Sequence, residues 1–182
     1  MIKRYILPPL VLTLICAAVS GLLALAYDAT YKDDTGVLTS KLVKACNEAS
    51  GEGDYEMLLS DGEPVTFDYD EVSSVIVDKT NKECFIELTE DGYSKGGLHF
   101  VVGIDHNGKV LGIGFVSCGE TPGLGSRTTE SEYLENYKKA DNAADVNGVD
   151  NVTSATYSSK GLKKGIVLAL EIFNDHKEEI FS

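Results

Sequence analysis

The chain has 182 residues, with 29 Asp and Glu against 16 Lys and Arg, and a formal net charge of −13. This length suits one domain with an accessory segment and is sufficient to bury a hydrophobic core. Because an acidic surface repels phosphate groups and anionic lipid headgroups, we expect no nucleic-acid partner.

An apolar run without charges extends from Tyr5 to Tyr27. A membrane-spanning helix needs roughly 20 consecutive apolar residues, so the run predicts a transmembrane anchor over residues 1–27. Pro8 and Pro9 lie near its start, where the backbone N–H groups of any helix lack partners and proline is tolerated. The sequence therefore predicts a single-pass protein of the cell membrane.

The charges that flank this run indicate its orientation. Lys3 and Arg4 precede it and Asp28 follows it, and an excess of basic residues marks the cytoplasmic side of a span. We therefore expect the N-terminus in the cytoplasm and the rest of the chain on the outer, periplasmic or extracellular, face. The alternative is a cleaved signal peptide, because residues 24–26 form an acceptable Ala-Leu-Ala cleavage site. The remainder of the chain is exported in both cases.

Residues 28–72 are expected to form a linker helix and a loop. Apolar residues at helical spacing over 37–45 predict a short amphipathic helix that continues from the span and holds the domain away from the bilayer. Residues 51–64 are acidic, contain glycine and predict a loop with a turn at Asp61-Gly62. The main domain is then expected over residues 73–182.

Four runs rich in β-branched and aromatic residues predict strands over residues 75–77, 84–88, 98–104 and 110–116. The last two are joined by Asn107-Gly108, a strong hairpin signal. Helices follow the strands and no β-α-β alternation is present. These features predict an α+β fold in which an antiparallel sheet packs with helices, preceded by the transmembrane helix.

Two helices are expected after the strands. Residues 131–140 predict one, with Tyr133 and Tyr137 on a face that we expect to be core. A polar connection over residues 141–148 leads to the last helix, which runs to about His176. Its apolar positions recur at helical spacing and are Leu162, Ile166, Ala169, Leu170 and Phe173.

The three cysteines outside the apolar run, Cys46, Cys84 and Cys118, are widely spaced and form no Cys-x-x-Cys pair. We therefore expect no metal site, because metal binding needs clustered ligands. Burial as small apolar residues is expected, with Cys118, two residues before Glu120, as the exception. An exported domain could also oxidise one pair, whose identity the sequence does not give.

A cluster of hydroxyls on small residues, from Asp150 to Ser159, opens the last helix. The first turn of a helix presents unpaired N–H groups and the positive end of the dipole, which favour a phosphate, so a hydroxyl there could carry a phosphoester. Three lysines in the early turns of this helix, Lys160, Lys163 and Lys164, could assist such an anion. The alternative is an ordinary N-cap formed by Thr153 or Ser154.

A glycine-rich loop, Glu120-Thr121-Pro122-Gly123-Leu124-Gly125, follows the last expected strand. Pro122 and Gly123 fit the two central positions of a type II turn, and Gly125 adds a second flexible point. The loop exposes backbone N–H groups while Leu124 offers an apolar face. The alternative is a simple tight turn at the end of a sheet.

Both segments resemble motifs of one family. Asp150-x-x-Thr153-Ser154-Ala155-Thr156 resembles the flavinylation motif Asp-x-x-Ser/Thr-Gly-Ala-Thr/Ser of the FMN-binding domain, which occurs in the G subunit of the Rnf electron-transport complex and the C subunit of the sodium-translocating NADH:quinone reductase. The loop at Glu120 to Gly125 is identical to the one that this family places against the flavin ring. The family has Gly where this chain has Ser154. If the family needs Gly there for a positive φ angle, Ser154 is strained. If the family needs only a small residue, serine is sufficient.

The resemblance implies a function for each motif. FMN would be attached covalently through a phosphoester to Thr156, with Asp150, Thr153, Ser154 and Ala155 as the attachment motif. The loop Glu120 to Gly125 would contact the ring, and Gly112 and Gly114 just before it would permit close approach of a flat group. A separate flavin transferase would attach the cofactor, since no P-loop, metal cluster or general base is found in the sequence.

The family further implies an electron-transfer protein without a complete reaction of its own. Its partners would be the other membrane and redox subunits of an ion-translocating ferredoxin:NAD oxidoreductase of the Rnf type. Two alternatives remain open at this point: a stand-alone flavinylated protein for extracellular electron transfer, and an exported binding module without redox chemistry.

Overall fold

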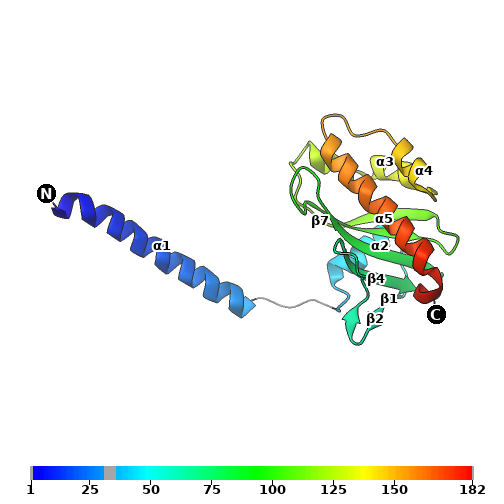
Figure 1. Ribbon diagram of the computed structural model, residues 1–182, viewed down its shortest axis with the longest axis horizontal. Helices are drawn as coiled ribbons and strands as arrows, with labels where there is room; N and C mark the ends of the chain where they lie inside the picture. Colours follow the sequence, from blue (N-terminus) through cyan, green and yellow to red (C-terminus); the bar gives the residue numbers. More distant parts are fainter. Residues whose placement is uncertain (1, 31–35, 182) are drawn as a thin grey trace. The chain divides into compact units, whose positions relative to one another are not determined.

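The structure is a computed structural model that describes residues 2–30 and 36–181. It contains two units, Met1–Asp34 and Thr35–Ser182, which Figure 1 shows as a single helix and a sheet domain. The first unit is the helix α1, Ile2–Thr30, with Pro8 and Pro9 inside it. Its segment Leu7–Thr30 is long and apolar enough to cross a membrane, with a mean hydropathy of 2.3. The expected apolar helix is therefore confirmed.

The second unit is built on a five-stranded sheet. Its strands are β1 (Tyr55–Met57), β4 (Val72–Asp78), β5 (Glu83–Glu90), β6 (Leu98–Ile104) and β7 (Val110–Cys118), in the order β1-β4-β5-β6-β7. Every neighbouring pair is antiparallel. The four expected strands and the α+β class are confirmed, whereas β1 was not expected.

Two tight turns agree with their sequence signals. Gly108 between β6 and β7 has a φ of +85°, and its N–H donates to the carbonyl oxygen of Asp105 at 2.9 Å, so the chain reverses where the Asn-Gly signal predicts a hairpin. The short strands β2 (Leu59–Ser60) and β3 (Glu63–Pro64) pair across Asp61 and Gly62, whose φ angles of 54° and 89° are both positive.

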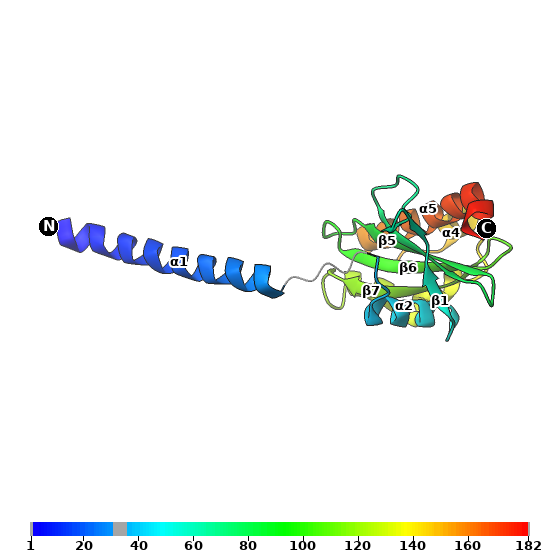
Figure 2. The ribbon, with the colours of Figure 1, turned by 90° about the horizontal axis from the view of Figure 1, so that it is seen from below.

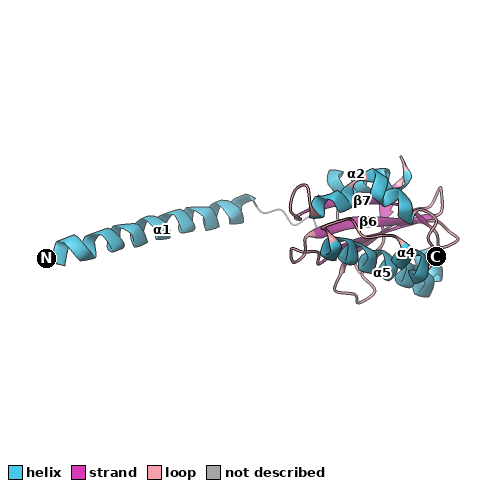
Figure 3. Ribbon diagram, turned by 90° about the horizontal axis from the view of Figure 1, so that it is seen from above, coloured by secondary structure: helices cyan, strands magenta, loops and turns pink. Residues whose placement is uncertain are grey.

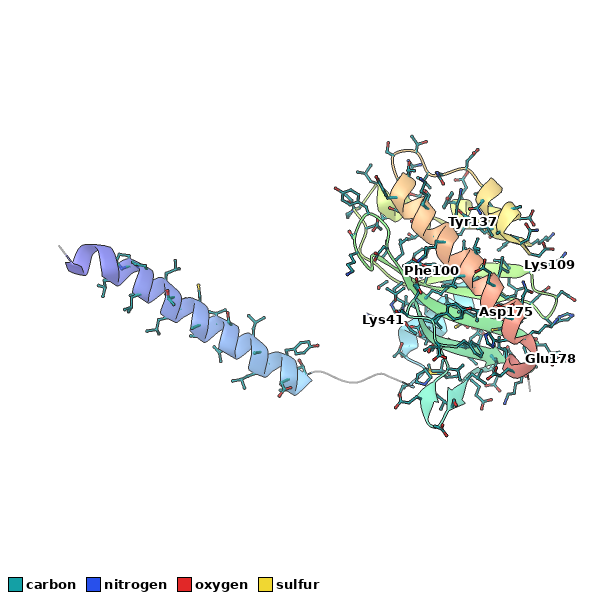
Figure 4. The ribbon with its side chains drawn as sticks, in the orientation of Figure 1. Lys41, Phe100, Lys109, Tyr137, Asp175 and Glu178 are labelled. Carbon is teal, nitrogen blue, oxygen red and sulfur yellow. The ribbon has the colours of Figure 1, made fainter. Side chains whose placement is uncertain are left out.

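Helices cover both faces of the sheet, which gives three layers (Figures 2 and 3). The helix α2 (Ser40–Ser50) lies on one face, and α5 (Thr156–Ile180) and α4 (Ala143–Gly148) lie on the other. The α5 face carries the larger core. Phe100 and Tyr137, both labelled in Figure 4, are fully buried in it.

The helix α2 belongs to the same compact unit as the sheet, whereas the sequence predicts a linker helix that continues from the span. Leu42, Ala45, Cys46 and Ala49 are buried against the sheet. A Cβ on Gly112 would overlap the carbonyl oxygen of Ala49, and one on Gly114 would overlap that of Ala45. These strand glycines therefore make room for the α2 backbone, and the expectation that a flat ring approaches there is wrong.

The segment between β7 and α5 is less regular than expected. It contains η1 (Gly125–Thr129), α3 (Ser131–Leu134), η2 (Glu135–Tyr137) and α4. The helix expected over 131–140 ends early because Lys139 and Ala140 pair with the backbone of Val110, at 2.8 and 2.9 Å. The helix α4 replaces part of the expected polar connection, and the side chain of Asn142 caps it.

Candidate functional site

The loop after β7 forms the expected turn. The carbonyl oxygen of Thr121 accepts hydrogen bonds from the N–H of Leu124 at 3.1 Å and of Ser126 at 3.2 Å. Gly123 has a φ of +74°, a conformation that glycine adopts without steric cost. The turn predicted at Pro122-Gly123 is therefore confirmed. Figure 1 shows the start of α5 beside the segment that follows this turn.

The first turn of α5 has no side-chain cap among the described residues. Its N-cap residue is Ala155, so the alternative that Thr153 or Ser154 caps the helix is wrong. Ser154, just before it, has a φ of +68°, the left-handed region that glycine favours. The torsion angle at this position is thus the one that the family glycine would serve. The first N–H groups of α5 face no side-chain acceptor and can bind an anion.

The hydroxyls at the start of α5 have different environments. Thr156 is exposed to solvent. Ser158 is 1% exposed and donates its hydrogen bond to the carboxylate of Glu120. Ser159 is fully buried, and its oxygen accepts a hydrogen bond of 3.0 Å from the N–H of Val152. Of these three, only Thr156 presents a free hydroxyl to a ligand.

A pocket of about 330 Å³ lies between the turn and the start of α5. This volume is within the range of small-molecule sites. The turn, the loop between β5 and β6 and the first residues of α5 contribute its lining, which is Tyr93, Glu120, Thr121, Leu124, Gly125, Ser154, Ala155, Thr156, Tyr157 and Ser158. The pocket therefore brings together residues of both sequence motifs.

Three large side chains on this pocket are exposed, which is unusual for apolar groups that cluster. Tyr93 is 76% exposed, Leu124 is 48% exposed and Tyr157 is 69% exposed. Such a rim can pack against a flat aromatic ligand. Neither Tyr93 nor Tyr157 belongs to the two sequence motifs. A tyrosine in the glycine-bearing 92–97 segment was the available signal for Tyr93.

Glu120 is 5% exposed and holds three chain segments together. Its carboxylate accepts hydrogen bonds from the N–H groups of Tyr93 at 3.1 Å and Ser94 at 2.9 Å, and from the hydroxyl of Ser158. Burial raises the pKa of Glu120, but the hydrogen bonds from Ser158, Ser94 and Tyr93 outweigh it and hold the pKa below its ordinary value. The carboxylate is therefore ionised at neutral pH and joins the β5–β6 loop to the start of α5.

Four residues of the two motifs lie outside the pocket lining. Pro122 and Gly123 form the exposed tip of the turn, with the N–H of Gly123 bound to the Ser126 hydroxyl at 2.9 Å. Asp150 and Thr153 line a neighbouring cleft of about 630 Å³, together with residues such as Arg127. The Asp150 to Thr156 motif therefore spans two cavities.

Two of the three lysines in the early turns of α5, Lys163 and Lys164, have partners away from the pocket, and Lys160 is exposed and does not line it. The Lys163 ammonium donates to the carbonyl oxygens of Val149 and Asn147 at the end of α4. Burial lowers the pKa of Lys163, and the nearby Asp150 charge opposes this effect. Lys164 forms ion pairs with Glu71 at 2.9 Å and Glu90 at 3.0 Å. Neither side chain lines the pocket, so both stabilise the fold here.

The cysteines differ in their access to solvent. Cys46 and Cys84 are buried and free, and Cys118 at the end of β7 is exposed. Burial raises the pKa of the Cys46 thiol to about 12, so this group is unreactive at neutral pH.

Comparison with known proteins finds similarity over the segment that contains this pocket. Residues 92–171 match the family model described as FMN-binding domain. The chain is 29% identical over 107 residues to the G subunit of the ion-translocating oxidoreductase complex of Shewanella piezotolerans, covering 52% of this chain and 50% of the relative. It is 32% identical over 88 residues to the G subunit of the proton-translocating ferredoxin:NAD(+) oxidoreductase complex of Clostridium ljungdahlii, covering 44% and 47%.

These matches have a defined extent. The chain spans about half the length of the curated relatives it matches, with 50% and 47% of their lengths aligned. The family match includes the loop after β7, the exposed threonine and most of α5. The pocket thus lies within the segment that matches the FMN-binding domain model.

Proposed function

We propose that this protein is a membrane-anchored electron-transfer subunit that carries FMN on Thr156, through a phosphoester, within an ion-translocating ferredoxin:NAD oxidoreductase complex of the Rnf type. The observation that carries the proposal is the exposed Thr156 at an uncapped helix start, on the same pocket as the loop after β7. The relatives named as subunits of such complexes support the wider assignment.

The start of α5 suits the phosphate group. An ester at Thr156 places the phosphate at the first turn, where the helix dipole is positive and N–H groups lack intrahelical partners. Ala155 has no side chain able to accept from those groups. A phosphate can therefore take the position that a capping side chain fills in other helices.

The pocket suits the isoalloxazine ring. Tyr93, Leu124 and Tyr157 offer exposed apolar surface to its faces, and the turn at Thr121 adds backbone groups. FMN bound there would supply the electron-transfer chemistry, while the protein orients the ring and sets its electrostatic surroundings.

The environments of the hydroxyls explain why Thr156 would be the attachment point. Ser158 and Ser159 are buried and engaged in hydrogen bonds, and Thr153 lines the neighbouring cleft. Attachment forms a bond between the Thr156 oxygen and the FMN phosphorus of FAD, breaks the pyrophosphate bond and releases AMP. A flavin transferase supplies the base that takes the hydroxyl proton.

The neighbouring cleft gives the transferase access to the motif. Asp150 and Thr153 lie on the cleft side of the Asp150 to Thr156 segment, and Thr156 lies on the pocket side. An enzyme can contact the first two residues while the flavin enters the pocket. In this proposal the domain lies on the outer face of the cell membrane, beside the membrane and redox subunits with which it exchanges electrons.

The test is the chemical identity of the modified residue. When the full chain is produced together with a flavin transferase, we expect flavin fluorescence on a denaturing gel and a flavin-modified peptide at Thr156. Thr156→Val removes both signals without unfolding the protein, whereas the control Ser158→Ala keeps them. Flavin that remains on the Thr156→Val protein, or maps to another hydroxyl, refutes the attachment site.

A further inference from the structure

The geometry points to Glu120 as a fixed negative charge that lowers the reduction potential of a flavin bound in the pocket. The inference rests on the proposed function and concerns how this chain controls that site. Glu120 lines the pocket together with Thr156, Leu124 and Tyr157, so its charge lies close to any group bound there.

The position of the carboxylate is set from three directions. The N–H groups of Tyr93 and Ser94 bind one oxygen each, at 3.1 and 2.9 Å, and the Ser158 hydroxyl binds from α5. Glycines surround it closely: a Cβ on Gly92 would lie 2.7 Å and one on Gly125 2.6 Å from a carboxylate oxygen. A larger residue at either position would displace the carboxylate, and the three hydrogen bonds hold the side chain in place.

Among the residues that the structure describes, no cation forms an ion pair with Glu120. Within residues 2–30 and 36–181, its recorded partners are two backbone amides and one hydroxyl, all formally neutral. The buried carboxylate of Glu90 differs, because it forms an ion pair with Lys164. A buried carboxylate held only by neutral donors retains its negative potential toward the pocket.

That potential acts against reduction of the ring. A flavin that takes up two electrons from its redox partner and one proton from solvent gains one negative charge. A carboxylate beside it raises the free energy of this reduced form more than that of the neutral oxidised form, because like charges repel and burial weakens screening. Glu120 therefore lowers the potential, which favours passage of electrons onward from this site.

The test compares midpoint potentials of the flavinylated full-length protein at one pH and one ionic strength. Glu120→Gln removes the charge, so we expect the equilibrium constant for reduction of the flavin to rise about tenfold. For a two-electron couple this corresponds to an upward shift of the midpoint potential by about 30 mV. Glu120→Asp retains the charge and is expected to stay near the wild-type value. Glu178→Gln removes an exposed charge near the far end of α5 (Figure 4) and is expected to have no effect.

Each outcome bears on the inference. If Glu120→Gln and Glu178→Gln give the wild-type potential, or if Glu120→Asp shifts as far as Glu120→Gln, the charge does not set the potential. If Glu120→Gln does not fold, Ser158→Ala provides the test. This variant removes one hydrogen-bond donor from the carboxylate, so the negative charge is less shielded and the midpoint potential of the flavin should fall. An unchanged or raised midpoint potential overturns the inference. A wild-type protein without covalent flavin refutes the proposed function instead, so the two failures are distinguishable.

Discussion

Ser154 is the residue at which the Asp150 to Thr156 segment departs from the family motif that it resembles, and it adopts a φ of +68°. A non-glycine residue in the left-handed region raises the energy of the folded state by roughly 1–2 kcal/mol relative to glycine. Glycine in turn lowers the free energy of unfolding by about 0.5–1 kcal/mol, because it makes the unfolded chain more flexible. The chain therefore keeps the backbone shape of the motif at a small cost in stability.

We expect Ser154→Gly to raise the free energy of unfolding by up to about 1 kcal/mol, because glycine removes this strain. Denaturant unfolding of the two proteins measures the change. Thr153→Gly is the matched control, because Thr153 has no recorded positive φ. Glycine relieves no strain there and loses more conformational entropy on folding, so this variant should be less stable than the wild type. Equal losses of stability in both variants would show that Ser154 is not strained.

Residue-level prediction from the sequence succeeded where the signal was local. The turn at Pro122-Gly123 and the helix start near Thr156 follow from neighbouring residues. The role of Glu120 could not be predicted, because its partners Ser158 and Tyr93 lie 38 and 27 positions away in the chain. Tyr93 was missed on the pocket for the same reason, since only the fold brings the β5–β6 loop to α5.

At the scale of elements, α2 and β7 pack with their backbones in close approach. Ala45 and Ala49 on the helix meet Gly114 and Gly112 on the strand, and small residues on both sides permit this distance. The periodicity of residues 37–45 predicted a helix but not its packing partner, because an amphipathic pattern shows only that one face is buried.

We expect Gly114→Ala to destabilise the protein by about 1–3 kcal/mol, since the added methyl group overlaps the α2 backbone, which must shift. Gly148→Ala, at a position with nothing within 4 Å of the added atom, is the control and should not destabilise. Thermal unfolding of protein free of flavin measures both. A stable Gly114→Ala protein that fails only in flavin binding would instead support a ring against this strand.

The whole molecule divides into α1 and the unit Thr35–Ser182. The fold class, the four longer strands and the apolar helix could be predicted because long apolar or β-branched runs carry those signals. The boundary expected at residue 73 leaves out α2 and β1, whose strand of three residues is too short to give a pattern. Tertiary packing joins them to the sheet.

Two shortened chains test this boundary. A chain of residues 36–182 should unfold cooperatively with a midpoint like that of the complete protein. A chain of residues 73–182 exposes the sheet face under α2, including Ile76, Phe85 and Val101, and should aggregate or lose its cooperative transition. Circular dichroism during heating distinguishes them. A stable 73–182 chain would show that α2 and β1 are dispensable.

The three-way contact of Glu120 has one more consequence. Because the side chain joins the β5–β6 loop, the turn and α5 through the protein's own hydrogen bonds, the seat for the cofactor is complete before a flavin arrives. The oxidised and the reduced ring would then contact the same pocket residues, and the protein would rearrange little when an electron is transferred. For a flavin bound as proposed, such rigidity would keep the reorganisation energy of electron transfer low, and the rigidity would come from the protein alone.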